Sequence, residues 1–199
     1  MSQAVDRTNL RAGVTVSVVS IAWTVVASTV AIVIGAQASS IVLVAFGCTG
    51  LLDAAGSVAL VVHFRHALRH ERFSERHEHV AFLVVTTGLV IVAVATIVDS
   101  VMHLLKAGAA EQSTAGVWVA AASAVVLALL ARRKIHLGRS IPSQALLADG
   151  VLSSTGALLA VVTVVGTVLA AHGWWWADPV AALVVALGAL SVALLLARQ

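Results

Sequence analysis

The sequence is poor in charged residues and in cysteine. Only 11% of its 199 residues are Asp, Glu, Lys or Arg, and 60% are apolar. A soluble domain is about 25% charged and roughly half apolar. The composition therefore excludes a soluble globular enzyme, and it also excludes a disordered chain, which would be polar and rich in charge. The single cysteine excludes a disulfide framework and a thiolate zinc cluster.

Six apolar segments occupy almost the whole chain. A helix needs roughly 20 residues to cross a hydrocarbon core of about 30 Å. We therefore predict an all-α membrane protein with six transmembrane helices in one domain (residues 13–197), after a cytosolic tail (residues 1–12) and with no soluble C-terminal domain. The predicted spans are residues 13–35, 39–63, 79–105, 116–131, 143–172 and 176–197. A cleaved signal peptide is the alternative for the first segment, although its apolar stretch exceeds the usual 7–15 residues or so.

The basic residues lie almost entirely on one side of this predicted bundle. The chain ends and the second–third and fourth–fifth connections hold 11 of the 12 Lys and Arg residues, Lys134 among them, and the other side holds only Lys106. The positive-inside rule then places both termini in the cytosol. We read the net charge of +3 as a topology signal and expect no nucleic-acid partner. Trp174–Trp176 fall at the opposite boundary, where aromatic residues are typical.

Two aspartates lie deep within the predicted spans. A carboxyl group at a helix centre costs about 2.5–3.5 kcal/mol on insertion scales, so such residues are candidates for function. Asp53 shares a helix face with Thr49, and Asp149 shares one with Ser153. The second helix runs inward and the fifth runs outward, so the two aspartates fall at similar depth and would share a proton or hold a cation. The alternative is that each carboxyl caps a backbone or bonds a neighbouring hydroxyl.

Histidines mark two further candidate sites. Asp99 and His103 are four residues apart on one face of the third helix, a spacing that can chelate a transition metal or simply form an internal hydrogen bond. The second–third connection contains five of the eight histidines, including His77 and His79. Histidine mixed with glutamate at this mouth would collect a divalent cation, or it would form a solvated loop that contacts lipid headgroups.

Three motifs resemble those of a known family. The fifth segment opens with S-x-A-L-x-A-D (residues 143–149), the sixth with G-W-W-W-A-D-P (residues 173–179), and the third with Arg-His-Glu (residues 76–78). Together they resemble the cation diffusion facilitator superfamily of divalent-metal/proton antiporters. The likeness is greatest to its short members without a cytosolic C-terminal domain, and the chain is also similar to the vesicular zinc transmembrane protein branch. The resemblance implies a six-helix bundle, a homodimer, and a metal site between the second and fifth helices.

The resemblance carries over to only part of the family's ligand set. The second-helix pair of acids is represented by Thr49 and Asp53, so its second acid is present. The fifth helix keeps the A-D pair that ends in Asp149, but Leu152 and Gly156 stand at the family's histidine and acid positions. Asp53 and Asp149, completed by Thr49, Ser153 and water, would form a harder and weaker site than tetrahedral zinc requires, which favours Mn²⁺, Fe²⁺ or a weakly held Zn²⁺.

These observations lead to one functional hypothesis with two alternatives. We expect a multi-pass protein of the bacterial plasma membrane that exports a divalent metal ion (Zn²⁺, Mn²⁺, Fe²⁺ or Co²⁺) in exchange for protons by alternating access. It would be neither an enzyme nor dependent on a cofactor. The first alternative is a non-transporting partner subunit that has lost its metal site. The second is an efflux carrier for an organic cation, against which the low aromatic content of 5% argues.

Overall fold

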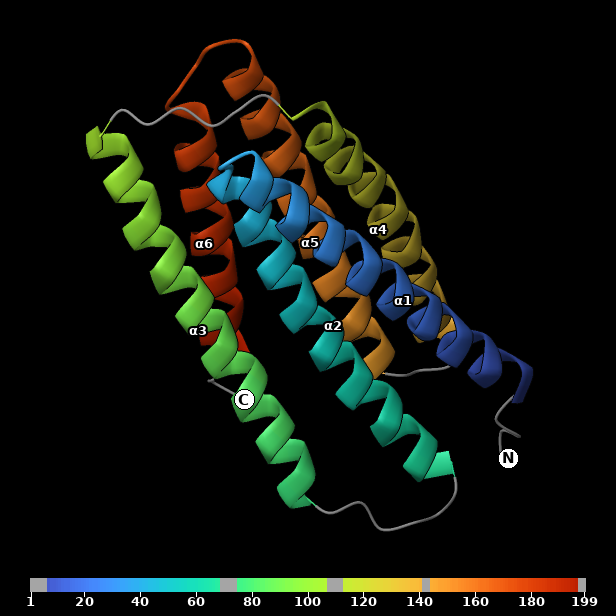
Figure 1. The fold of residues 1–199 in the computed structure, drawn as a ribbon. Coiled ribbons are helices and arrows are strands. Elements are labelled where there is room, and N and C mark those ends of the chain that lie inside the picture. The colour runs from blue at the N-terminus through green and yellow to red at the C-terminus, as the bar shows by residue number, and fades with distance from the viewer. Residues whose placement is uncertain (1–6, 69–74, 107–112, 141–143, 197–199) are drawn as a thin grey trace.

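The computed structural model describes residues 7–68, 75–106, 113–140 and 144–196, without some side chains near helix ends. In this part of the chain all regular structure is helical, which confirms the predicted class. The helices run alternately up and down (Figure 1), so α1 begins and α6 ends at the same end of the bundle. The helices are α1 (Arg7–Gln37), α2 (Ile41–Leu68), α3 (Glu75–Lys106), α4 (Thr114–Ser140), α5 (Gln144–Ala171) and α6 (Ala177–Leu196).

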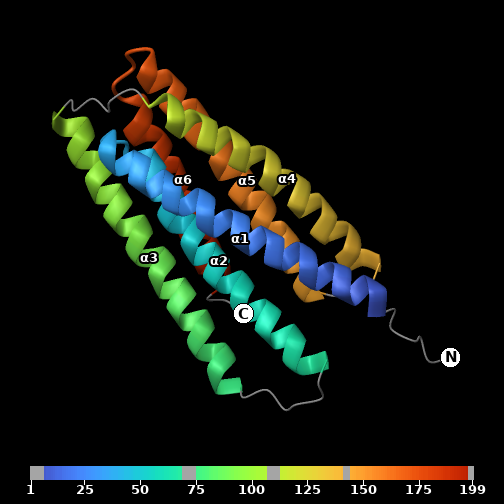
Figure 2. The same ribbon diagram turned by 45° about the vertical axis from the view of Figure 1, so that its right-hand side comes forward.

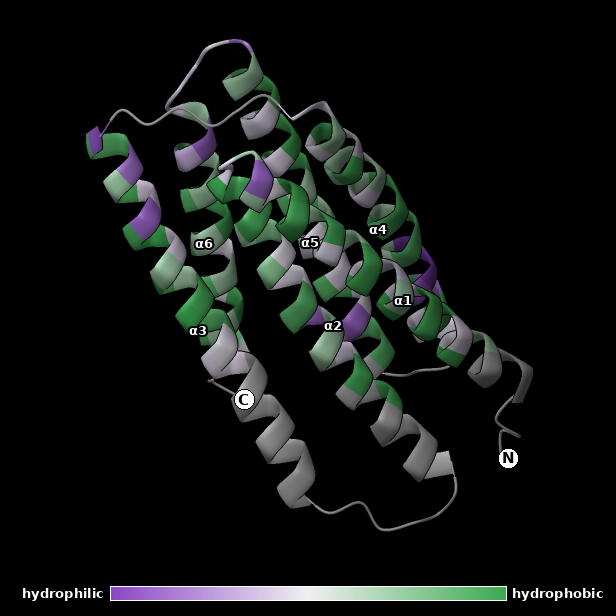
Figure 3. Cartoon of the chain, in the orientation of Figure 1, coloured by the Kyte–Doolittle hydropathy of each residue, from purple (hydrophilic) through white to green (hydrophobic). Residues whose placement is uncertain are grey.

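The helices have the length and composition of membrane spans. Five of them are long and apolar enough to cross a bilayer, and α2 adds a shorter apolar stretch, Ile41–Ala55, among the described residues. Apolar colouring covers most of their described length (Figure 3). Large apolar side chains also point outward, among them Val26, Ile91 and Leu129, each more than half exposed. Helices that are apolar on the outside as well as the inside are typical of a lipid environment, so the outer faces are suited to contact acyl chains.

Helices α1, α2, α4 and α5 pack together as a four-helix bundle, and α3 pairs with α6 beside α2. The turned view in Figure 2 keeps α3 and α4 on opposite sides of the molecule. Small residues let the bundle helices approach closely. A Cβ atom added at Gly47 of α2 would lie 2.6 Å from the carbonyl oxygen of Ser28 in α1. Such close backbone contact is how helices associate in lipid, where burial of apolar surface contributes little.

A buried carboxylate joins α6 to the start of α2. Asp178, in the first turn of α6, accepts hydrogen bonds from the backbone N–H groups of Ile41 at 2.8 Å and Val42 at 3.3 Å, and from the hydroxyl of Ser40. Ser40 precedes the first residue of α2, and its Oγ accepts from the N–H of Leu43 at 3.4 Å, as an N-cap residue does. The carboxylate thus satisfies helix-terminal donors that would otherwise be buried without partners.

Helix α4 extends further than the sequence predicts. We expected a span ending at residue 131, followed by a basic connection, but the helix continues to Ser140. Its buried face follows a spacing of three and four residues, and Lys134 lies on that face. Arg132 and Arg133, by contrast, are exposed. Lys134 is therefore not a surface charge, and counting it with the cytosolic connection was wrong. The buried residues of α4 are Gly116, Ala120, Ser123, Leu127, Ala131, Lys134 and Gly138.

Candidate metal site

Asp149 lies at the centre of the four-helix bundle and is surrounded by donors. Its side chain is 1% exposed. The Nζ atom of Lys134, on α4, lies 2.9 Å from its Oδ2 atom. Ser17 of α1 donates to the same oxygen at 3.1 Å, and Ser57 of α2 donates to Oδ1 at 2.8 Å. The carboxylate on α5 therefore contacts polar groups from the three other helices of the bundle.

The ammonium group of Lys134 is equally well satisfied. Besides Asp149, it contacts the Oγ atoms of Ser20 at 3.0 Å and Ser153 at 2.9 Å, to which it donates. Its three N–H donors are thus matched by three oxygen atoms. Two charges buried together are stable only when such extra hydrogen bonds offset their loss of water. We call this set of residues the polar layer: Ser17, Ser20, Ser57, Lys134, Asp149 and Ser153.

Asp53 lies beside the polar layer but is not part of it. It is half-buried on α2, one helical turn from Ser57. It experiences the charges of both Asp149 and Lys134, which places it in the same region of the bundle. Within the described residues it makes no hydrogen bond or ion pair. The structure therefore brings the two predicted aspartates together, but it leaves only the carboxylate of Asp53 available for a ligand.

The two predicted neutral ligands already have partners. Thr49 is buried one turn from Asp53, and its hydroxyl donates within α2, with the carbonyl oxygens of Ala45 and Phe46 at 2.9 and 3.0 Å. Its oxygen keeps a lone pair that a cation can use. Ser153 belongs to the polar layer. Among the residues described, no group of three or more His, Cys, Asp or Glu side chains is arranged to hold a metal ion.

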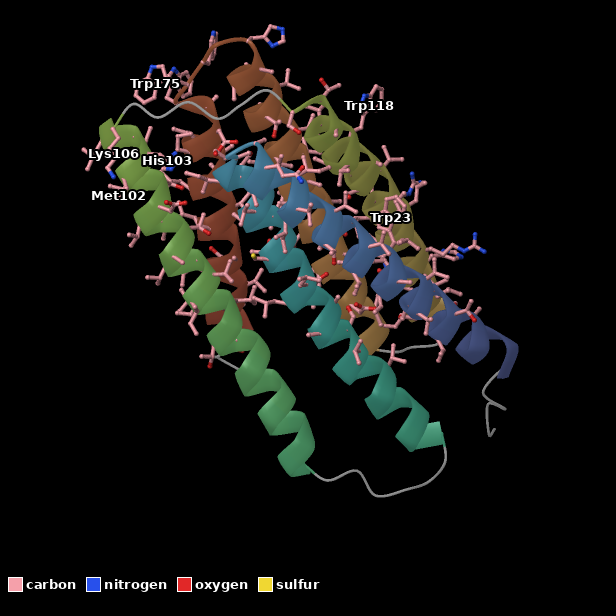
Figure 4. All side chains as sticks on the ribbon, in the orientation of Figure 1. Trp23, Met102, His103, Lys106, Trp118 and Trp175 are labelled. Carbon is pink, nitrogen blue, oxygen red and sulfur yellow. The ribbon has the colours of Figure 1, made fainter. Side chains whose placement is uncertain are left out.

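A cavity opens at the end of the bundle where α1 turns into α2. It has a volume of about 490 Å³ and lies between α2 and α3. Asp99 and His103 are both on its wall, with His103 Nε2 4.0 Å from Asp99 Oδ1. Figure 4 shows His103 and Lys106 at the same end of the molecule as Trp175. The polar residues of the lining are Ser39, Ser40, Cys48, Thr96, Asp99 and His103.

The cavity follows α2 from Ile41 to Cys48, and Asp53 is not part of its lining. Cys48 is the last residue of α2 in this lining, and it precedes Asp53 by five residues, about 7.5 Å along the helix axis. The predicted Asp99/His103 pair thus lies on the wall of a largely apolar cavity that ends short of the Asp53 carboxylate. The side chains of His77 and His79, in the first turns of α3, lie outside the residues whose side chains are described.

Sequence reasoning did not find several polar residues of this region. Lys134 was assigned to a connection, although its spacing from Ala131 and Gly138 matches the buried face of α4. The hydroxyl residues of α1 were also overlooked. Ser17, Ser20, Thr24 and Ser28 recur at three- and four-residue spacing and are all buried, so one face of α1 is polar inside an apolar segment. This three- and four-residue spacing of hydroxyl residues is the sequence pattern that could have predicted the polar face of α1.

Comparison with known proteins finds similar sequences over most of this chain. The manganese efflux system protein MneS of Bacillus subtilis is 30% identical over 185 residues, which cover 89% of this chain and 63% of MneS. An uncharacterized transporter of Methanocaldococcus jannaschii is 28% identical over 181 residues, which cover 88% of this chain and 64% of that protein. The chain thus spans slightly less than two thirds of each relative.

The family model agrees with these similarities. The model of the cation efflux transmembrane domain matches residues 17–199, which include all six helices except the start of α1. It confirms the resemblance that the sequence motifs indicated, and it confirms the expectation that the protein is not an enzyme. The chain, with its six helices and its acidic groups between α2 and α5, belongs to the cation efflux family of membrane proteins.

Proposed function

We propose that this protein is a secondary transporter that moves a divalent metal cation out of the cytosol in exchange for protons. The observation that carries the proposal is Asp53, a carboxylate inside an apolar helix with no hydrogen-bond partner among the described residues. An ionisable group in that position is costly and is retained where an ion or a proton binds. Membership of the cation efflux family supports the same conclusion.

The donors available near Asp53 favour a hard cation. One carboxylate, the hydroxyl oxygen of Thr49 and water make an oxygen-rich shell, which suits Mn²⁺ better than the nitrogen- and sulfur-rich tetrahedron typical of structural Zn²⁺. The naming of the relative MneS as a manganese efflux protein supports this choice. We propose Mn²⁺ as the preferred cargo, with Fe²⁺, Co²⁺ and Zn²⁺ as weaker substrates.

The cavity suggests how the cation leaves. In an alternating-access cycle the same site opens first to one side of the membrane and then to the other. The cavity bounded by Asp99 and His103 would be the outward passage, and His77 and His79 would collect cations at the inner mouth. Protons and the metal ion would compete for Asp53, which couples their opposite movements. We further propose that two copies of the chain form a homodimer in a bacterial cell membrane.

Transport by the purified protein in liposomes tests this proposal. With a pH gradient imposed, Mn²⁺ flux should exceed that of empty vesicles, and Asp53→Ala should reduce it to the empty-vesicle level. Thr29→Ala is a suitable control, because Thr29 is an exposed residue of α1 whose hydroxyl donates to the carbonyl of Val25 at 2.8 Å within the same helix. It should leave flux unchanged. A folded Asp53→Ala protein that transports at the wild-type rate would remove the central claim.

A partner subunit that does not transport is the second candidate. The contact between Lys134 and Asp149 favours it, because one of the two expected carboxylate ligands already holds a positive charge. In that case the folded protein would move none of the four metal ions. It would instead copurify from native membranes with a second, complete transporter of the family. Flux by the isolated protein would rule this candidate out.

A further inference from the structure

The position of Lys134 in the bundle is unusual for a lysine in a membrane protein. Lysine near a helix end normally extends toward the headgroups and keeps its charge in water. Arg132 and Arg133, its neighbours on α4, are exposed. Lys134 instead lies on the buried face of α4, and its side chain is 0% exposed. Its charge is held in the interior by specific contacts.

Those contacts occupy the side of Asp149 that a metal ion would need. Both carboxylate oxygens already accept hydrogen bonds. Oδ2 accepts from the hydroxyl of Ser17 and lies 2.9 Å from Nζ of Lys134, and Oδ1 accepts from the hydroxyl of Ser57. A divalent cation bound to Asp149 would lie close to the ammonium group, and the repulsion between like charges is strong in an environment of low dielectric constant. A metal ion and Lys134 therefore compete for this carboxylate.

We propose that Lys134 is a resident cation that replaces the metal ion at Asp149 and so sets the charge of the transport site. With Lys134 in place, Asp149 is a counter-ion and not a metal ligand, and Asp53 alone supplies the charge that binds the cargo. The three groups together carry one net negative charge, so a bound divalent ion leaves the region with a net positive charge. Such a site binds weakly and releases readily, as a carrier requires. The inference rests on the proposed function only for its transport consequences.

A double-mutant cycle on the purified protein tests the ion pair itself. Lys134→Met and Asp149→Asn should each lower the apparent melting temperature, because each leaves a buried charge without its partner. The double variant K134M/D149N should recover most of that loss, since no buried charge then remains unpaired. Arg133→Met removes the same charge from the adjacent exposed position and should have no effect. Additive losses in the double variant would overturn the pairing.

Transport by the same variants tests the role of Asp149. The double variant K134M/D149N should still carry Mn²⁺ in liposomes, and adding Asp53→Ala to it should abolish flux. Lys134→Met alone frees the second carboxylate, so Mn²⁺ binding should tighten by about ten-fold or more. If K134M/D149N folds but carries no Mn²⁺ while the wild type does, Asp149 is a ligand and the inference fails.

The two readouts separate this inference from the proposed function. The stability cycle uses the protein without cargo, so it reports on the ion pair even if the wild type moves no ion. A wild type that moves no ion would contradict the proposed function but not the ion pair. If Lys134→Met does not fold, Lys134→Arg and the double variant still decide the question. Lys134→Arg keeps the charge and should retain more stability than Lys134→Met, and equal losses for the two would contradict a charge-based role.

Discussion

Replacement of Asp178 by alanine should destabilise the protein, because it removes the hydrogen bonds that join α6 to the start of α2. The carboxylate accepts from the hydroxyl of Ser40 and from the N–H groups of Ile41 and Val42, at 2.8 and 3.3 Å for the two amides. All four residues are less than 9% exposed, so water does not replace the lost acceptor. A buried donor left without a partner costs about 1–3 kcal/mol. With two amides and a hydroxyl affected, the expected loss of stability is about 3–5 kcal/mol.

The expected loss can be measured by thermal unfolding in detergent, followed by tryptophan fluorescence. For a chain of this size, 1 kcal/mol corresponds to about 2–4 °C, so Asp178→Ala should lower the apparent Tm by roughly 6–20 °C. Asp178→Asn keeps one acceptor oxygen and should lose about half as much. Asp99→Ala is the control. Asp99 is 61% exposed and its Oδ1 atom lies 4.0 Å from Nε2 of His103, so the Tm of this variant should stay near the wild-type value. An unchanged Tm for Asp178→Ala would refute the capping role of the carboxylate.

Two further predictions concern the packing of α1 against α2 and the cavity beside α3. Gly47→Ala should cost about 1–3 kcal/mol of stability, because the new Cβ would lie 2.6 Å from the carbonyl oxygen of Ser28. Gly156→Ala is its control, as that Cβ would meet only a Leu127 methyl at 3.4 Å, and a similar loss in both variants would contradict the argument. The single cysteine, Cys48, lines the cavity, so a small thiol reagent added to the outer face of vesicles should label it and reduce Mn²⁺ flux. Absence of labelling in folded protein would show that the cavity is closed from that side.

The sequence predicted the number of helices, and the described helices overlap the six predicted spans. The gap between the first two predicted spans falls at residues 36–38, and the turn between α1 and α2 lies at residues 38–40. Helix α4 differs most from its predicted span, because the basic residues after Ala131 have the composition of a connection. Composition averages over a window, whereas the buried face of a helix depends on every third or fourth residue. Lys134 falls on that face, and the residues around it do not.

The candidate site was predicted in part. Asp53 and Asp149 were identified because a carboxylate in an apolar segment is conspicuous in any sequence, and the structure places them in the same region. Asp178 was not recognised as a structural group, because its partners are more than 130 residues away along the chain. Hydrogen bonds over such separations depend on how α6 packs against α2, which no local pattern records.

The sequence by itself determined that this chain forms six apolar helices, because a helix in lipid must satisfy its own backbone and expose apolar side chains, and both are local properties. Tertiary structure decided what the charged residues do. The rotation and register of α4 against α5 bring Lys134 to 2.9 Å from Asp149, and α1 and α2 contribute the hydroxyl groups around them. The strength of a charge interaction depends on distance and on the surrounding dielectric. Only the packed bundle sets these two quantities, and it leaves Asp53 as the unpaired carboxylate of the described site.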